Sequence, residues 1–340
     1  MAPQSANSSS SLWDLLRKLF ARFTSSPPIT PPVDNLIEPV KIISSRVLLV
    51  VYDPVMDPGT GTKLSTMMKW NRPGDLVSAF IQDILQASHG MARYQVVERI
   101  ELDELPTQVD GFTYTPQNYL SVINNNQPAH TPPMADYNAI LSRLDIGGRI
   151  TKREIDEVWL FAFPYAGFYE STMAGAGAFW CNAPPITKTA NNARRFVIMG
   201  FSYERGVGEM LESFGHRAES ILERTFSKCS EATNLFAKFT RYDKKNPGLA
   251  EVGNIHFAPN STRDYDWNNQ RMVLSACDDW YNFPNFKGVK KMVNAAEWGR
   301  GDIRAHHTWW LKHLPHVAGR TSGVHNNWWQ YIANPNNVPS

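Results

Sequence analysis

The sequence contains few cysteines, no long apolar run and no secretory signal. Its three cysteines are too few and too widely spaced for a disulfide framework or a cysteine-rich zinc site. No run of 18 apolar residues occurs, so no membrane-spanning helix is predicted. The serine-rich first ten residues lack the basic start and the apolar core of a signal peptide. These absences favour a cytoplasmic protein.

An excess of charge of either sign is also missing. The 340 residues include 34 Lys and Arg and 32 Asp and Glu, which gives a net charge of +2, and only 19% of the residues are charged. No broad basic surface is expected, and we therefore predict no nucleic-acid partner. Hydrophobic residues, at 42%, are sufficient for a large core. The expected substrate is a small molecule, a glycan or a peptide.

The N-terminal segment, residues 1–44, is predicted to lie outside the main fold. Residues 11–23 place apolar side chains mostly at steps of three and four, with Arg17, Lys18 and Arg22 between them, which is typical of an amphipathic helix. Such a helix could contact a membrane surface peripherally or direct the chain to an organelle. The alternative is a helix that docks on its own domain. The Pro- and Ser-rich residues 25–33 cannot continue the helix and predict a linker.

Short apolar runs alternate with helical patterns in the next part of the chain, residues 45–252. Four runs rich in β-branched or aromatic residues predict buried strands at residues 46–52, 94–100, 157–163 and 195–201. Helical periodicity covers residues 75–87, 136–144 and 208–226. Strands that alternate with helices favour a mostly parallel sheet with helices on both faces. We therefore predict an α/β domain over residues 45–252.

Polar side chains follow the predicted strands at their carboxyl ends. Tyr169 and Glu170 come after the third strand, and Arg205 comes after the fourth. Ligands of parallel sheets bind beyond these ends, so Tyr169 and Arg205 are candidate substrate-binding residues and Glu170 is a candidate catalytic base. Loops are polar in general, and the competing interpretation is that these residues only face solvent.

The helix predicted over residues 208–226 carries an acidic face. At about 100° per residue, five polar residues fall on one side of it, namely Glu209, Glu212, His216, Glu219 and Glu223. A face that only meets solvent would gain from interleaved cations, whereas like charges at these spacings repel by about 0.2–0.5 kcal/mol per pair. Carboxylates one turn from a histidine are typical of metal binding or proton transfer. A solvated face and a buried ion network remain the alternatives.

The composition changes again after residue 252. Residues 254–340 hold 7 of the 11 Trp and 6 of the 9 His, with little clean periodicity. Exposed loops would not carry so many indole rings, so we predict an irregular extension, residues 253–340, that packs over the α/β domain. His256 is the candidate for a missing metal ligand, and Trp280 and His307 are candidates for substrate binding. Each of these residues alone is more typically structural.

These patterns together favour a metal-dependent hydrolase with its site between the acidic helix and the extension. Glu212, His216 and His256 would hold a divalent ion, zinc or manganese, and Glu209 or Glu170 would accept a proton from water. The HExxH and HxxEH signatures of known zinc proteases are absent. Two alternatives remain: a metal-free glycan-active enzyme that uses paired carboxylates, and a non-catalytic module that binds carbohydrate or protein.

Overall fold

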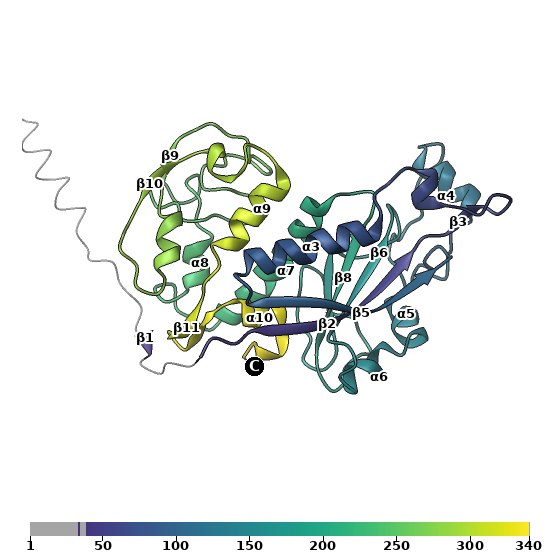
Figure 1. Cartoon of the computed structure of the whole chain (residues 1–340), viewed down its shortest axis with the longest axis horizontal. Helices are drawn as coiled ribbons and strands as arrows, with labels where there is room; N and C mark the ends of the chain where they lie inside the picture. Colours follow the sequence, from purple (N-terminus) through teal and green to yellow (C-terminus); the bar gives the residue numbers. More distant parts are fainter. Residues whose placement is uncertain (1–32, 35–38, 340) are drawn as a thin grey trace, which may run out of the picture.

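The computed structural model describes residues 33–34 and 39–339, and its centre is a five-stranded sheet (Figure 1). The strand order is β5-β2-β6-β8-β7, and all neighbours are parallel except β7 and β8. The strands are β2 (Ile43–Tyr52), β5 (Ala92–Leu102), β6 (Glu157–Ala162), β7 (Ser171–Ala174) and β8 (Phe196–Ser202). The predicted α/β fold with a mostly parallel sheet is confirmed.

The four predicted strands correspond to β2, β5, β6 and β8. The prediction of a buried strand is wrong for residues 94–100, because β5 is an edge strand and most of its residues are exposed or half-buried. Both faces of the central strands are covered, which explains why they are continuous apolar runs: every residue of β6 is buried. The edge strand β7 is not predicted by the sequence. It is only four residues long and antiparallel to β8, and its sequence, Ser-Thr-Met-Ala, carries neither an apolar run nor a clear alternation.

Helices cover both faces of the sheet (Figure 1). The helices α3 (Pro73–Ala87) and α7 (Val207–Phe226) lie on one side, and α5 (Tyr137–Arg143) and α6 (Ile146–Thr151) lie on the other. Phe80 of α3 contacts Trp159 of β6 and Phe214 of α7, with ring centroids 5.3 and 5.9 Å apart. The three predicted helices correspond to α3, α5 and α7. Shorter elements of this part are α2 (Leu64–Met67), α4 (Pro116–Ile123), β3 (Val55–Asp57) and β4 (Thr62–Lys63).

A buried ion pair fixes α7 on the sheet. The fully buried Arg217 donates hydrogen bonds of 3.0 and 2.8 Å to the carboxylate of Glu157 at the start of β6. The same guanidinium donates to the carbonyl oxygen of Ile332 in α10 (Trp329–Ala333), at 3.1 and 2.9 Å. Because the loss of one partner would leave a buried charge uncompensated, at a cost of about 3–5 kcal/mol, this network holds α7, β6 and α10 in register.

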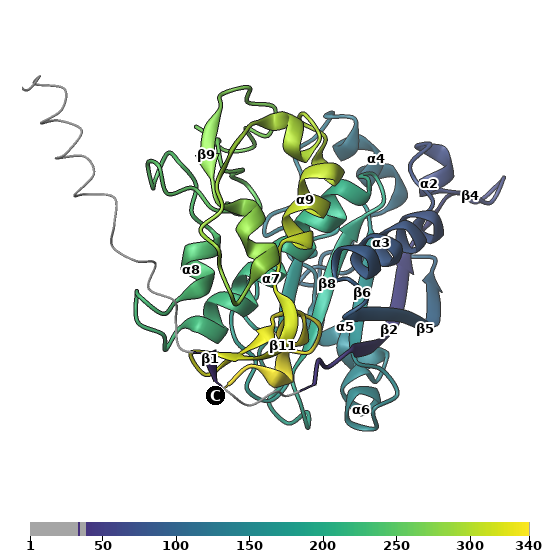
Figure 2. The same ribbon diagram turned by 60° about the vertical axis from the view of Figure 1, so that its left-hand side comes forward.

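The last part of the chain consists of short elements joined by loops and packs on α7, α3 and the sheet (Figure 2). Trp298, Trp310, Trp328 and Trp329 are at most 1% exposed, which confirms the predicted packing of the Trp-rich extension. The elements of this extension are β9 (Val273–Ser275), η1 (Cys277–Asn282), β10 (Lys291–Val293), η2 (Ala295–Trp298), α9 (Ile303–Lys312), β11 (His316–Thr321), β12 (Val324–Asn327), α10 and η3 (Pro335–Asn337). The short helix α8 (Leu235–Phe239) precedes the extension. A two-residue strand, β1 (Val33–Asp34), pairs with β11.

The predicted amphipathic helix, residues 11–23, and most of the predicted linker lie outside the described residues. Among the residues that the structure describes, no helix combines the length and the apolar character needed to cross a bilayer.

Asp156 connects two basic side chains at the amino end of the sheet. Its carboxylate accepts hydrogen bonds from Nε of Arg46 at 2.8 Å and from a guanidinium nitrogen of Arg194 at 2.7 Å. Burial raises the pKa of Asp156, but the hydrogen bonds from Arg46 and Arg194 outweigh burial and lower the pKa to about 2. The unfolded chain has a pKa of about 3.9 at this carboxyl, so the ionised group stabilises the fold above about pH 4.

We predict that Asp156→Asn lowers the free energy of unfolding by about 2 kcal/mol at pH 7. The stabilisation by Asp156 is lost as the pH falls from about 4 toward 2, since the folded-state pKa lies below the unfolded one. Urea unfolding of both proteins at pH 7 and pH 3 measures the difference. If the free energies of unfolding of the wild type and Asp156→Asn differ by the same amount at pH 7 and at pH 3, this account is contradicted.

Candidate metal centre

Helix α7 places Glu212 and His216 one turn apart on its polar side. The helix starts after Gly206, whose backbone N–H donates to the carboxylate of Glu209 at 3.1 Å. Its apolar side packs against the sheet and α3, as the sequence pattern indicates. The polar side is covered as well, because Glu212 is only 7% exposed. The solvated-face interpretation is therefore wrong for Glu212, and it holds for Glu223, which is exposed.

Two glycines of α7 allow the C-terminal part of the chain to approach this side closely. A Cβ atom on Gly208 would lie 2.4 Å from Ile303 at the start of α9, and one on Gly215 would lie 2.3 Å from Ile255. The backbone N–H of Ile255 donates to Oε1 of Glu219 at 2.9 Å. The chain therefore crosses α7 at Gly215, and the next residue, His256, reaches the face that carries Glu212 and His216.

The side chains of Glu212, His216 and His256 converge on one point. The Nε2 atoms of the two histidines are 2.9 Å apart, and Oε1 of Glu212 lies 3.1 Å from Nε2 of His256 and 4.0 Å from Nε2 of His216. Ligand atoms at about 2.0–2.2 Å from a tetrahedral ion are roughly 3.3–3.6 Å apart, so small side-chain movements would fit the three atoms around one ion. The structure thus brings together the three residues that the sequence suggests as metal ligands.

The other ring nitrogens determine which atoms face the centre. Nδ1 of His216 donates to Oε2 of Glu219 at 3.0 Å, and Nδ1 of His256 lies 3.0 Å from Oδ1 of Asp264. A carboxylate accepts only, so Nδ1 carries the hydrogen in both rings. In the neutral rings each Nε2 then carries a lone pair and no hydrogen. The lone pairs of His216 and His256 therefore point toward each other beside Oε1 of Glu212. Such a set of acceptors requires a cation or added protons, and a carboxylate behind each histidine is the usual support of a metal ligand.

The charges of the cluster shift the pKa values of His216 and Glu212 in opposite directions. Burial lowers the pKa of His216, but the hydrogen bond and charge of Glu219, with the charges of Glu170 and Glu212, raise it above the ordinary value. Burial raises the pKa of Glu212, but hydrogen bonds with His256 and Tyr265 and the charges of both histidines lower it below the ordinary value. The carboxylates thus favour the charged form of His216, and the imidazoles favour the charged form of Glu212.

Two further histidines lie behind the cluster on α9. Nε2 of His307 is 4.0 Å from Oε2 of Glu212 and has no hydrogen-bond partner among the described residues. His306 and His307 share one contact through their Nδ1 atoms, at 3.0 Å, and both rings pack against Trp267. Burial lowers the pKa of His307 well below its ordinary value and that of His306 to about 3, so both rings are neutral at pH 7. The buried Nε2 of His307 therefore adds a polar atom beside Glu212 that no other described group satisfies.

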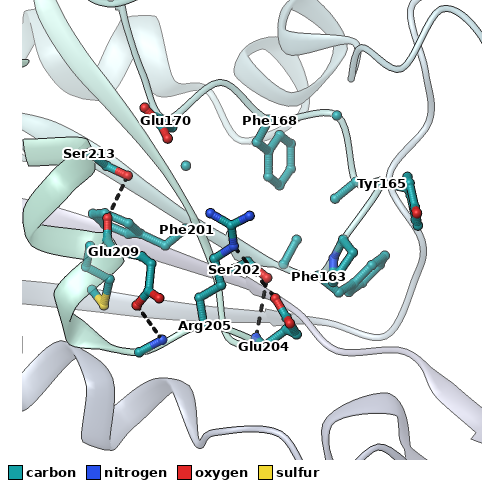
Figure 3. A pocket seen from close by; sticks show the side chains of 17 residues that line it. Phe163, Tyr165, Phe168, Glu170, Phe201, Ser202, Glu204, Arg205, Glu209 and Ser213 are labelled. Atoms are coloured by element: carbon teal, nitrogen blue, oxygen red, sulfur yellow. Dashed lines mark hydrogen bonds and ion pairs between the residues drawn. The ribbon is translucent and has the colours of Figure 1, made fainter. Parts of the chain in front are cut away.

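A cavity of about 220 Å³ opens at the carboxyl ends of β6 and β8 and runs along the start of α7 (Figure 3). Glu170 and Glu209 both line it, and Figure 3 shows the guanidinium of Arg205 directed into it. Oε2 of Glu170 accepts a hydrogen bond of 2.7 Å from Asn182. None of Glu212, His216 and His256 lines the cavity, but Ser213, which follows Glu212 in α7, does. The cavity and the cluster therefore both lie along the first half of α7.

Three residues suggested for substrate binding lie elsewhere. Trp280 is 2% exposed, donates to Glu251 at 2.9 Å and packs among other aromatic rings, so it belongs to the core and cannot stack on a substrate. His307 is fully buried behind Glu212 and not on the rim. Tyr169 is half-buried, stacks on Tyr137 and is not among the residues that line the cavity. The sequence does not indicate which way an aromatic or imidazole ring points, which explains why Trp280 and His307 are buried. The role of Tyr169 in substrate binding stays a prediction.

Tyr265 and Asp264 are functional candidates that sequence reasoning missed. The hydroxyl of Tyr265 donates to Oε1 of Glu212 at 3.0 Å and lies 3.1 Å from Nε2 of His256. Burial, the hydrogen bond to Glu212 and nearby acidic charges raise the pKa of Tyr265 to about 12, which keeps the phenol protonated. Its φ of 54° is rare for a residue other than glycine and turns the ring onto His256. The only sequence sign is that Asp264 and Tyr265 follow His256 closely.

Comparison with known proteins does not assign this chain to a family. No protein-family model matches this chain, and no curated protein sequence matches it.

We predict that the cluster of Glu212, His216 and His256 binds one Zn²⁺ or Mn²⁺ ion. The variants His216→Ala, His256→Ala and Glu212→Gln should each weaken binding at this cluster at least about 100-fold. The reason is that each removes an atom facing the centre. Isothermal titration of metal-free protein gives the affinity. Glu223→Gln, an exposed carboxylate on the same helix, is the matched control and should leave the affinity unchanged. Equal affinities for all four variants and the wild type would contradict the assignment.

We also predict that Gly215→Ala weakens metal binding, because its methyl group overlaps Ile255 and displaces the neighbouring His256. Overpacking of this kind costs about 1–3 kcal/mol of stability. The double variant Gly215→Ala, Ile255→Ala removes the overlapping atoms and should recover most of the affinity. If the single variant binds metal as well as the wild type does, the close approach at Gly215 does not position His256.

Proposed function

We propose that the protein is a metal-dependent hydrolase whose divalent ion is held by Glu212, His216 and His256. One observation carries this proposal: two Nε2 lone pairs and a carboxylate oxygen converge within 4.0 Å, and each histidine is supported from behind by a carboxylate. The ligands come from a helix and from a loop 40 residues further along the chain. The mixed imidazole and carboxylate set suits zinc or manganese.

The arrangement of the cavity beside this centre suits hydrolysis. A divalent ion there would lower the pKa of a bound water from about 15.7 to about 7. Glu170 is the better of the two candidate bases, because it lines the cavity and only one of its oxygens has a hydrogen-bond partner among the described residues. Glu209 is less available, since its carboxylate accepts the N–H of Gly206 at the start of α7.

The lining of the cavity indicates what kind of substrate it would take. Phe163, Phe168 and Phe201 form apolar walls, and Arg205 brings a positive charge. Arg205 would bind an anionic group of the substrate and orient the bond to be cleaved toward Glu170. Tyr265, which stays protonated, donates its one hydrogen to Oε1 of Glu212 and would orient this carboxylate toward the ion.

A metal-free glycan-active enzyme is the second candidate. It is favoured by one observation, that Glu170 and Glu209 line the same cavity together with aromatic side chains. Because the two candidates share Glu170, a variant of this residue alone does not separate them. Their response to metal removal does.

The test uses purified full-length protein and a panel of chromogenic esters, amides, phosphoesters and glycosides. We predict that hydrolysis of at least one substrate stops with a chelator and returns with Zn²⁺ or Mn²⁺. Glu170→Gln should keep the metal but lose about 10²- to 10⁴-fold in kcat, because the general base is gone. Glu223→Gln, an exposed carboxylate of α7 that does not line the cavity, is the matched control and should change kcat less than about threefold.

Two results would overturn the proposal. Activity that persists in the chelated protein and falls with Glu170→Gln would support the glycan-active alternative. Binding of less than about one tenth of an equivalent of metal after loading with zinc would end the metal hypothesis.

A further inference from the structure

A second cluster of ligand-type side chains lies at the far end of α9, away from the cavity. It consists of Cys277 and Asp278 at the start of η1 and His313 directly after α9. Sγ of Cys277 is 3.7 Å from Oδ1 of Asp278, and Nε2 of His313 is 4.0 Å from the same oxygen. Neither the fold described above nor the proposed hydrolase uses these residues.

The hydrogen bonds of His313 leave its Nε2 without a donor or acceptor. Nδ1 of His313 lies 2.8 Å from the carbonyl oxygen of Trp309, and a carbonyl accepts only, so Nδ1 carries the hydrogen. In the neutral ring Nε2 is then a lone pair. The His313 side chain is 1% exposed, and Nε2 has no hydrogen-bond partner among the described residues. A buried lone pair that faces a carboxylate oxygen is unfavourable unless a positive charge lies between them.

The remaining groups around the cluster match the second shell of a metal site. Nζ of Lys291 lies 2.8 Å from Oδ2 of Asp278 and 2.6 Å from Oε1 of Glu297. Lys291 therefore orients the carboxylate of Asp278 so that its other oxygen, Oδ1, can bind a metal ion. A thiolate, the two carboxylates of Asp278 and Glu297, and the Lys291 ammonium sum to two negative charges. A divalent ion would neutralise them.

The distances and the ligand types agree with zinc. For Zn–S near 2.3 Å and Zn–O or Zn–N near 2.1 Å, tetrahedral ligands lie about 3.6 Å apart across sulfur and about 3.4 Å apart otherwise. The separations of 3.7 and 4.0 Å are close to these values. Thiolate with imidazole selects zinc over the hard cations magnesium and calcium. Asp278 is 39% exposed, which leaves one side of the cluster open for a water as fourth ligand.

We propose that Cys277, Asp278 and His313 bind a second divalent ion, zinc by preference, which fastens η1 to the end of α9. Binding releases the thiol proton of Cys277 to solvent and forms the metal–sulfur bond, with no change in oxidation state. Because α9 also carries His306 and His307, the second ion would hold that helix in place behind the first centre.

Cobalt is the probe, because sulfur ligation gives Co²⁺ an intense near-ultraviolet charge-transfer absorption that nitrogen and oxygen ligands do not. Metal-free full-length protein is titrated with Co²⁺. We expect the wild type to bind two equivalents of Co²⁺ with the charge-transfer absorption. Cys277→Ser and His313→Gln should each bind one equivalent without that absorption.

The double variant His216→Ala, His256→Ala should bind one equivalent of Co²⁺ fewer than the wild type and keep the absorption, so the loss of one site is distinguished from the loss of the other. Cys229→Ser, a half-buried cysteine outside the cluster, is the matched control and should behave as the wild type does.

A measurement on the wild type keeps the proposal testable if the Cys277 or His313 variants do not fold. Alkylation by iodoacetamide in mild urea, followed by mass spectrometry, reports the reactivity of each cysteine. Zn²⁺ should slow the modification of Cys277 at least tenfold in wild-type protein and in the His216→Ala, His256→Ala variant alike. The proposal is overturned if Zn²⁺ leaves the rate at Cys277 unchanged, or if the cobalt complex of the wild type shows no sulfur-to-metal absorption.

Discussion

The constraint on which the candidate site depends is that three hydrogen-bond acceptors, two imidazole nitrogens and a carboxylate oxygen, meet in one place with too few hydrogens between them. The Nε2 atoms of His216 and His256 are 2.9 Å apart. The Nδ1 atom of each ring contacts a carboxylate, that of Glu219 or of Asp264. The hydroxyl of Tyr265 supplies one hydrogen, to Glu212. The rest of the negative potential has to be met by a cation or by protons, and the raised pKa of His216 is the response of the ion-free centre to the same potential.

The fold produces this convergence through helix α7, which is covered on both sides. The apolar side is held to the sheet, and the buried pair of Arg217 and Glu157 prevents the helix from sliding or rotating. The polar side meets the C-terminal part of the chain, which comes close only because residues 208 and 215 are glycines. A helix with one solvated side would need neither the glycines nor the cover, and its carboxylates would stay hydrated. Because the acidic side of α7 is buried, the stability of this region depends on the cation or the protons that bind beside Glu212.

Much of this organisation is visible in the sequence, and the reasons differ by element. The central strands are found because both of their faces are covered, so they form unbroken apolar runs, and α7 is found because its two sides differ in polarity. Glu212 and His216 follow from helical spacing alone. The partner His256 follows from a weaker argument, that the acidic side needs a cover and that the Trp-rich segment is apolar enough to supply one.

The rest depends on tertiary contacts that leave no local pattern. The strand β7 has no apolar pattern because pairing with β8, and not its own composition, defines it. The direction of Trp280 and His307 is set by neighbours from distant parts of the chain, which is why residues expected on a rim are buried. Tyr265 reaches the centre through one left-handed residue in a loop, and no periodicity predicts such a turn.

Anomalous X-ray diffraction from crystals of the zinc-loaded protein, measured on both sides of the zinc absorption edge, tests the central claim most directly. The account predicts a zinc peak within about 2.0–2.2 Å of Nε2 of His216, Nε2 of His256 and Oε1 of Glu212. A well-ordered centre with no zinc peak, in which the two imidazoles and the carboxylate keep their positions and protons occupy the space between them, would contradict it.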